Sequence, residues 1–147
     1  MLSDKLAVSQ DQVASGNGLI AGQAIHAGEV LWQPETKLPF LTNEQRKQLK
    51  DRRGYSQIDL DLFVRCYDNE WFFNHSCAPN CIIKDHLLIA VRDIPEGEEV
   101  TYDYGLTEIT ISWSFWCSCA KDGCRKHVSN LDYLNASLRT RMASYCP

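Results

Sequence analysis

The 147-residue sequence contains no apolar run that approaches the roughly 18–20 residues of a membrane-spanning helix. Its first ten residues, MLSDKLAVSQ, lack the apolar stretch of a secretory signal peptide. No linker divides the chain, and no low-complexity segment interrupts it. These absences and the modest length predict one compact domain in an intracellular setting, either the nucleus or the cytoplasm.

The sequence has fewer basic than acidic residues: it contains 15 Lys and Arg against 19 Asp and Glu, so the net charge is −4. The content of 44% hydrophobic and 23% charged residues is typical of a folded globular protein. An acidic surface is poorly suited to binding phosphates, but it suits a basic peptide. We therefore expect a basic protein or peptide as partner and no direct contact with nucleic acid or membrane; the oligomeric state is left open.

Short strands joined by tight turns dominate the local patterns. Strands are predicted at residues 19–21, 30–32, 81–83 and 87–91, and the last two form a hairpin through Lys84-Asp85-His86. The phrases IHAGEV (25–30) and IPEGEEV (94–100) resemble each other, but two copies do not indicate a repeat protein.

Two helices are predicted. Thr42 and Gln45 form a capping box for a charged, outward-lying helix that runs until Gly54. In the second, apolar residues recur every three or four positions, at Leu131, Leu134, Leu138 and Met142. This pattern predicts an amphipathic helix over 129–142, capped by Ser129 or Asn130, that completes the core, covers a pocket or forms a dimer.

The segment WFFNHSCAPNC (71–81) concentrates small polar groups beside three aromatic rings. The rings are expected to end a buried strand, and the polar residues after them to form a hydrogen-bonded turn. A buried amide or imidazole without partners costs about 1–3 kcal/mol, so such groups are seldom placed beside a core without a reason. Two interpretations follow: a polar loop with structural cysteines, or a ligand-binding turn that contains a metal ligand.

The segment FWCSCAKDGCRKH (115–127) spaces three cysteines as C-x-C-x4-C, at Cys117, Cys119 and Cys124. Seven cysteines in all, an odd number, argue against a simple disulfide framework. Three close thiolates favour Zn²⁺, which takes four ligands, and either His127 or Cys77 can be the fourth. The alternative is a set of reduced cysteines without a metal.

Four motifs together resemble one known family. They are GNGLIA (16–21), NHSCAPN (74–80), EEVTYDYG (98–105) and the C-x-C-x4-C segment. In this order they are similar to the SET-domain family of protein lysine methyltransferases with a post-SET zinc segment, over roughly residues 13–126. The resemblance implies that the fourth ligand of the zinc is Cys77, with Cys117, Cys119 and Cys124.

The resemblance also implies the fold and the domain boundaries. It predicts a mostly β fold with short helices (α+β), the β-clip of small sheets with a C-terminal pseudoknot, a threaded exception to the usual topology. The expected division is a SET domain at 1–112, a post-SET zinc-binding segment at 113–128 and a C-terminal helical tail at 129–147.

In this family S-adenosylmethionine lies on one face and the substrate lysine enters from the other. The resemblance assigns cofactor contacts to Gly16, Asn17, Gly18, Asn74, His75, Phe115 and Trp116. A core histidine is the alternative for His75, and plain core packing for Phe115 and Trp116. Many members carry Arg where Trp71 stands, which weakens the expected cofactor anchoring. A short insert between the first two motifs predicts a minimal substrate groove.

Tyr104 matches the catalytic tyrosine of the family, and Tyr102 stands where members carry Phe or Tyr. A hydroxyl at Tyr102 restricts the space around the amine, which predicts mono- or di-methylation. The alternative is that both tyrosines are strand residues in an aromatic core. The expected function is S-adenosylmethionine-dependent N-methylation of a lysine in a basic protein segment, with a histone tail as the natural candidate. The competing functions are an inactive cofactor- or peptide-binding module and a zinc-stabilised interaction protein.

Overall fold

The computed structural model describes residues 1–13, 16–35, 39–51 and 54–143. The elements in chain order are β1 Leu6–Val13, β2 Gly16–Ala21, β3 Val30–Trp32, α1 Asn43–Lys47, β4 Tyr55–Asp59, β5 Leu62–Arg65, 3-10 helix η1 Asp68–Phe72, β6 Asn74–His75, β7 Cys81–Lys84, β8 Leu87–Ala90, β9 Thr101–Tyr102, 3-10 helix η2 Tyr104–Leu106, β10 Ser114–Trp116, β11 His127–Ser129, 3-10 helix η3 Asp132–Leu134 and α2 Ala136–Ala143.

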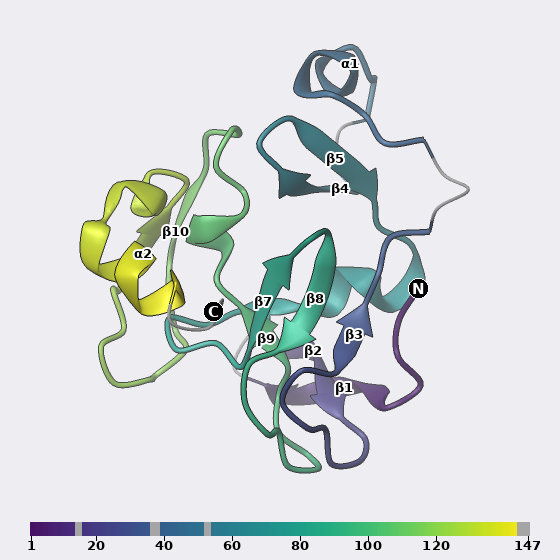
Figure 1. The fold of residues 1–147 in the computed structure, drawn as a ribbon, viewed down its shortest axis with the longest axis vertical. Helices are drawn as coiled ribbons and strands as arrows, with labels where there is room; N and C mark the ends of the chain where they lie inside the picture. The colour runs from purple at the N-terminus through teal and green to yellow at the C-terminus, as the bar shows by residue number, and fades with distance from the viewer. Residues whose placement is uncertain (14–15, 36–38, 52–53, 144–147) are drawn as a thin grey trace.

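The described strands form five small sheets (Figure 1). The order β3-β8-β7 makes the three-stranded sheet, and β1-β2, β4-β5 and β10-β11 are antiparallel pairs, whereas β6 and β9 run parallel. The prediction of a mostly β fold with short helices is confirmed. No helix in the described part of the chain is long and apolar enough to cross a membrane.

The predicted hairpin of β7 and β8 is confirmed with a tighter turn. Lys84 pairs with Leu87, so two residues connect the strands. Asp85 and His86 both have positive φ, 50° and 67°. Positive φ at both central positions is the type I′ arrangement, whose twist matches that of the flanking strands.

The two similar phrases of the sequence lie side by side. Ile25 and Ile94 exchange backbone hydrogen bonds of 2.9 Å in both directions, and both side chains are fully buried. Beside them, Val100 N–H donates to the carbonyl of Leu19 at 2.8 Å. These contacts hold the β2 strand against the segment that leads into β9. The core continues from there through Leu31, Val64, Leu88 and Val100.

The parallel pair of β6 and β9 brings together two segments that are far apart in sequence. Asn74 faces Thr101, and His75 faces Tyr102. Asn80 locks the pair, because its Oδ1 accepts from Thr101 N–H at 2.9 Å and its Nδ2 donates to the carbonyl of Glu99 at 2.8 Å. Such closeness is what a C-terminal pseudoknot requires, and the threading itself stays a prediction.

The first helix is much shorter than predicted. The capping box is present, with Gln45 N–H donating to Thr42 Oγ1 at 3.2 Å and Thr42 N–H to Gln45 Oε1 at 2.9 Å. However, α1 ends at Lys47, and Arg52 and Arg53 of the predicted helix lie outside the described residues. None of its residues is buried, so no packing extends the helix.

The three aromatic residues 71–73 do not end a buried strand, so that prediction was wrong. Trp71 is 47% exposed and Phe73 is 7% exposed, and Trp71 and Phe72 form the end of the 3-10 helix η1. The Glu70 carboxylate accepts from Tyr67 N–H at 2.9 Å, which closes this turn. The Trp71 ring packs over Gly54, where an added Cβ would lie 2.8 Å from a ring carbon.

The continuous helix predicted over 129–142 is also wrong. Ser129 ends β11, and α2 begins only at Ala136, where Asn135 Oδ1 accepts from the N–H groups of Ser137 and Leu138 at 3.1 and 3.3 Å. Leu131 and Leu134 of the supposed apolar stripe are 57% and 58% exposed. Residues 144–147 lie outside the described part.

Candidate active site

A cleft of about 410 Å³ opens between the β6–β9 pair and the segment formed by β10 and the residues that follow it. Its wall on the β6 side includes Asn74, His75 and Tyr104, and its other wall includes Phe115 and Trp116. Cys117 and Cys119 also line it. Four of the residues that the sequence analysis assigned to cofactor binding line this one cleft: Asn74, His75, Phe115 and Trp116.

Asn74 is fixed by two hydrogen bonds from its amide nitrogen. The Nδ2 donates to the carbonyl of Asn17 at 2.8 Å and to Glu99 Oε1 at 2.7 Å. Gly16, Asn17 and Gly18 are not among the residues that line the cleft, but Asn17 is tied to its wall through Asn74. Trp71 likewise does not line the cleft.

His75 is a buried and uncharged imidazole. Its side chain is only 3% exposed, and burial lowers its pKa to about 4, although Asp103 raises it. Its Nδ1 accepts from Tyr104 N–H at 3.3 Å. The same Nδ1 lies 3.5 Å from Asp103 Oδ1, and Nε2 lies 3.4 Å from Cys77 Sγ.

Aromatic rings form the wall opposite Asn74. Phe115 stacks on Trp113 at 5.8 Å and meets the His75 ring edge-on at 5.4 Å. Trp116 is 78% exposed and touches the ring of His127 at 5.3 Å. The cleft thus carries an apolar face, much of it open to solvent, that a flat ligand can cover.

Tyr102 and Tyr104 touch each other and line different cavities, of which the second is a hollow of about 110 Å³. Their ring centroids are 4.9 Å apart; Tyr104 lines the cleft and Tyr102 lines the hollow. The Tyr104 hydroxyl donates to the carbonyl of Phe73. Burial raises the pKa of both tyrosines above the ordinary value, so neither hydroxyl is ionised near neutral pH.

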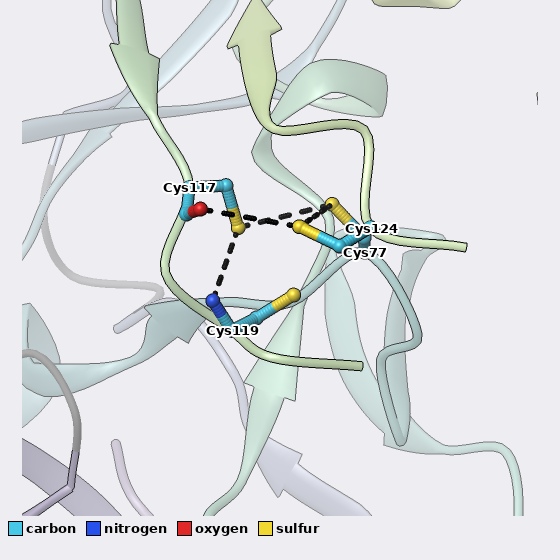
Figure 2. Close-up of side chains that lie close together, drawn as sticks. All are labelled: Cys77, Cys117, Cys119 and Cys124. Carbon is cyan, nitrogen blue, oxygen red and sulfur yellow. Dashed lines mark hydrogen bonds between the residues drawn. The ribbon is translucent and has the colours of Figure 1, made fainter. Parts of the chain in front are cut away.

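The four cysteines 77, 117, 119 and 124 converge on one point (Figure 2). Their sulfur atoms all lie within 4.8 Å of one another, and Cys77 Sγ is 3.8 Å from Cys117 Sγ and 4.0 Å from Cys124 Sγ. Ligands at the Zn–S distance of about 2.3 Å in a tetrahedron have sulfurs about 3.8 Å apart. The cluster has the size that a zinc ion requires. His127 lies outside this cluster.

Backbone donors surround these sulfurs. Cys119 N–H points to Cys117 Sγ at 3.4 Å, and Arg125 N–H points to Cys77 Sγ at 3.4 Å. Partial burial opposes ionisation of Cys119, but backbone N–H groups and the neighbouring thiols lower its pKa to about 6. A thiolate is the form that binds metal, so the chemistry of the cluster fits a cation.

Sequence reasoning missed an ion-pair network beneath the site. Arg125 donates to both carboxylate oxygens of Asp103 at 2.7 Å, and its Nε lies 2.7 Å from Asp132 Oδ2. The Asp103 side chain is 1% exposed. Asp103 stands in the TYDYG segment and Arg125 follows Cys124, but no local pattern pairs residues 22 positions apart.

Arg125→Ala should lower the free energy of unfolding by about 3–5 kcal/mol, because it leaves the Asp103 carboxylate buried without its partner. Urea unfolding measures the change, with the exposed Arg139→Ala as the matched control. A loss no larger than that of the control would show that Asp103 does not depend on this guanidinium.

The chain has clear relatives. Residues 16–105 match the family model described as SET domain. The chain is 34% identical over 130 residues to histone-lysine N-methyltransferase trithorax of Drosophila virilis, covering 78% of this chain and 3% of that protein. It is 33% identical over 140 residues to probable histone-lysine N-methyltransferase set-23 of Caenorhabditis elegans, covering 80% and 57%. With human histone-lysine N-methyltransferase 2D the identity is 38% over 132 residues, covering 75% and 2%. The chain therefore spans at most just over half the length of these relatives.

Proposed function

Because this chain belongs to the SET-domain family, we propose that it is an S-adenosylmethionine-dependent protein-lysine N-methyltransferase. Its substrate is a lysine in a basic protein segment. Histone tails are the first candidates, because the relatives above are named as histone-lysine N-methyltransferases. We expect the protein to be located where such substrates occur, in the nucleus or the cytoplasm.

The observation that carries this proposal is a pair of touching tyrosines that line two different cavities, Tyr104 the cleft and Tyr102 the smaller hollow. A methyl donor and an amine must approach each other in line, from opposite directions. The cleft of about 410 Å³ has the size of an ordinary cofactor pocket. The smaller hollow, lined by Tyr102, is the place for the lysine side chain.

The residues of the cleft fit S-adenosylmethionine by their chemistry. Trp116 and Phe115 offer aromatic faces to an adenine, while Glu99, which accepts from Asn74 Nδ2, brings a carboxylate to the cleft. Asn74 and His75 would hold the cofactor partly through backbone groups, with Gly16, Asn17 and Gly18 behind Asn74. When bound, the cofactor supplies a methyl group on a positively charged sulfur.

The chain's own task is to align a neutral amine and to exclude water. A free lysine has a pKa of about 10.4, so keeping it neutral near pH 7.5 costs roughly 4 kcal/mol. Burial in the hollow and a positive charge nearby both lower the pKa of the lysine. Because the Tyr104 hydroxyl is a neutral donor and acceptor, it orients the amine and is no strong base.

We assign a structural zinc to Cys77, Cys117, Cys119 and Cys124. Since Cys117 and Cys119 also line the cleft, the metal would fix one wall of the cofactor site. Arg141 of α2 donates to the carbonyl of Cys77 at 2.8 Å, so the C-terminal helix supports the same loop. The proposed segments are 1–112, 113–128 and 129–147, although the β10–β11 pair joins across the last boundary at Ser129.

Tyr102→Phe should raise the methylation degree, from mono- or di-methylated lysine toward the next higher state. The substitution removes a hydroxyl that occupies space, or holds a water, beside the amine in the second hollow. Mass spectrometry of a single-lysine peptide checks this, with Tyr55→Phe as the control. Identical product distributions from the wild type and Tyr102→Phe would refute the role.

The proposal is tested by incubating the chain with labelled S-adenosylmethionine and a panel of basic proteins. Label on lysine supports it. A thermal shift with the cofactor but no label would favour the inactive binding module, and a chain that zinc removal unfolds but the cofactor does not shift would favour the interaction protein.

A further inference from the structure

The segment that follows the four-cysteine cluster reaches back to the active site through Asp132. This residue begins the 3-10 helix η3 and lies outside residues 16–105, which match the SET domain. Its Oδ2 lies 2.7 Å from Arg125 Nε, and the side chains of these two residues are only 17% and 16% exposed. Its Oδ1 accepts from the Ser129 hydroxyl at 3.3 Å. The Asp132 carboxylate is therefore held at both of its oxygens.

The guanidinium group of Arg125 is bound along two of its edges. Its Nη1 and Nη2 donate to Asp103 Oδ2 and Oδ1, each at 2.7 Å, while its Nε faces Asp132. Because a guanidinium is planar and its donors point in fixed directions, it can meet both carboxylates in only one orientation. Asp132 therefore fixes the plane of the guanidinium and, through it, the Asp103 carboxylate.

Both chain neighbours of Tyr104 depend on this arrangement. Asp103 Oδ1 also accepts from Gly105 N–H at 3.0 Å, which caps the short helix η2 that starts at Tyr104. Asp132 packs directly on Gly105, where an added Cβ would lie 2.7 Å from Asp132 Cβ. The residue before Tyr104 is thus held through Arg125, and the residue after it by direct contact. The backbone between them sets the direction in which the tyrosine ring leaves the chain.

We propose that Asp132 is a positioning residue for Tyr104, acting through Arg125 and Asp103. This inference rests on the function proposed above, in which the Tyr104 hydroxyl orients the amine. Asp132 itself lines neither the cleft nor the smaller hollow. It keeps the backbone on both sides of Tyr104 in place, so that the hydroxyl stays aligned for in-line transfer. A part of the chain beyond the SET domain match thereby completes the active site.

The segment around Asp132 is also anchored independently of its carboxylate. Asn130 N–H donates to the carbonyl of Trp113 at 3.2 Å, and Asn130 Nδ2 donates to the carbonyl of Ile109 at 3.4 Å. Asp132→Asn keeps the size of the side chain and removes its charge, so it should leave this segment in place. The change is milder than Arg125→Ala, which leaves a buried carboxylate without its partner.

The experiment measures kcat and KM with a lysine-containing histone peptide for the wild type, Asp132→Asn and Arg125→Lys, with the exposed Asp4→Asn as the matched control. Arg125→Lys keeps the positive charge but lacks the rigid fork. We expect kcat to fall about tenfold in both variants, because a small displacement of an aligning group slows the reaction, while KM and the affinity for S-adenosylhomocysteine change less than about twofold. Asp4→Asn should match the wild type. An Asp132→Asn protein with the kcat of the wild type would overturn the inference.

A double-mutant cycle gives a readout that a general loss of stability would not move. In the Tyr104→Phe background, Asp132→Asn should lower kcat less than about twofold, since the hydroxyl that it positions is already missing. Equal losses in the two backgrounds would show that Asp132 acts elsewhere, and would overturn this inference alone. A wild type that methylates nothing would overturn the proposed function, and this inference with it.

A measurement without turnover covers variants whose activity is too low to follow. In carbon NMR of labelled tyrosine rings, the Tyr104 signal should shift in Asp132→Asn, whereas the signal of Tyr67, which lies outside the cleft, should not. If Asp132→Asn does not fold, Ser129→Ala replaces it, because it removes the hydroxyl that holds Asp132 Oδ1. A Tyr104 signal that stays unchanged in the folded variant would contradict the link.

Discussion

Tyr104→Phe is expected to lower kcat/KM for lysine methylation by about 10²–10³-fold, the range seen when one preorganised hydrogen-bonding group is removed from an active site. Tyr104 lines the cleft, and its hydroxyl is fixed by the carbonyl of Phe73. Without the hydroxyl, the amine and the methyl group lose a group that aligns them, while the ring still fills its place between His75 and Phe115.

Cofactor affinity should change little in this variant, because the loss concerns the reacting atoms and not the aromatic wall. Steady-state kinetics and calorimetric titration with S-adenosylhomocysteine separate the two effects. Tyr67→Phe is the control, since Tyr67 is 39% exposed and lies outside the cleft. A Tyr104→Phe protein with wild-type kcat/KM would show that the reaction does not use this hydroxyl.

Cys77→Ser is expected to release the metal and to give the largest loss of stability of any single substitution at the site. Structural zinc in small domains contributes about 10–16 kcal/mol at neutral pH. A chain of this size has a total stability of about 5–15 kcal/mol, so losing even part of that contribution is severe. Chelation of the wild type should have a similar effect, and should also weaken cofactor binding, because Cys117 and Cys119 line the cleft.

Elemental analysis for zinc and thermal unfolding measure both consequences. Cys81→Ala is the matched control: this thiol is fully buried but lies outside the four-cysteine cluster, so the variant should keep its zinc. A wild-type protein that purifies without metal, melts unchanged in chelator and tolerates Cys77→Ser would contradict the assignment.

The local elements that the sequence predicted well depend on near neighbours. The Thr42–Gln45 capping box and the β7–β8 hairpin each involve residues a few positions apart, and both are present. The lengths of the two helices depended on packing that no local pattern reveals. An apolar periodicity at Leu131 and Leu134 indicated a buried face, yet both side chains are exposed.

The site shows the same division. The C-x-C-x4-C spacing marked three sulfurs, but spacing alone left His127 and Cys77 open, and the meeting with Cys77, 40 residues away, is a property of the fold. The pairing of Arg125 with Asp103, 22 positions apart, also depends on a long-range contact. The order of the motifs in the sequence predicted the family, whereas the ion pairs that support the site could be identified only from the three-dimensional structure.

Mass spectrometry of core histones incubated with the wild-type chain and S-adenosylmethionine carrying a heavy methyl group tests the central claim most directly. The account predicts heavy methyl groups on lysine side chains, in mono- or di-methylated form, and their absence with Tyr104→Phe. Histones that stay unmodified, with a chain shown to be folded, zinc-loaded and bound to the cofactor, would contradict it.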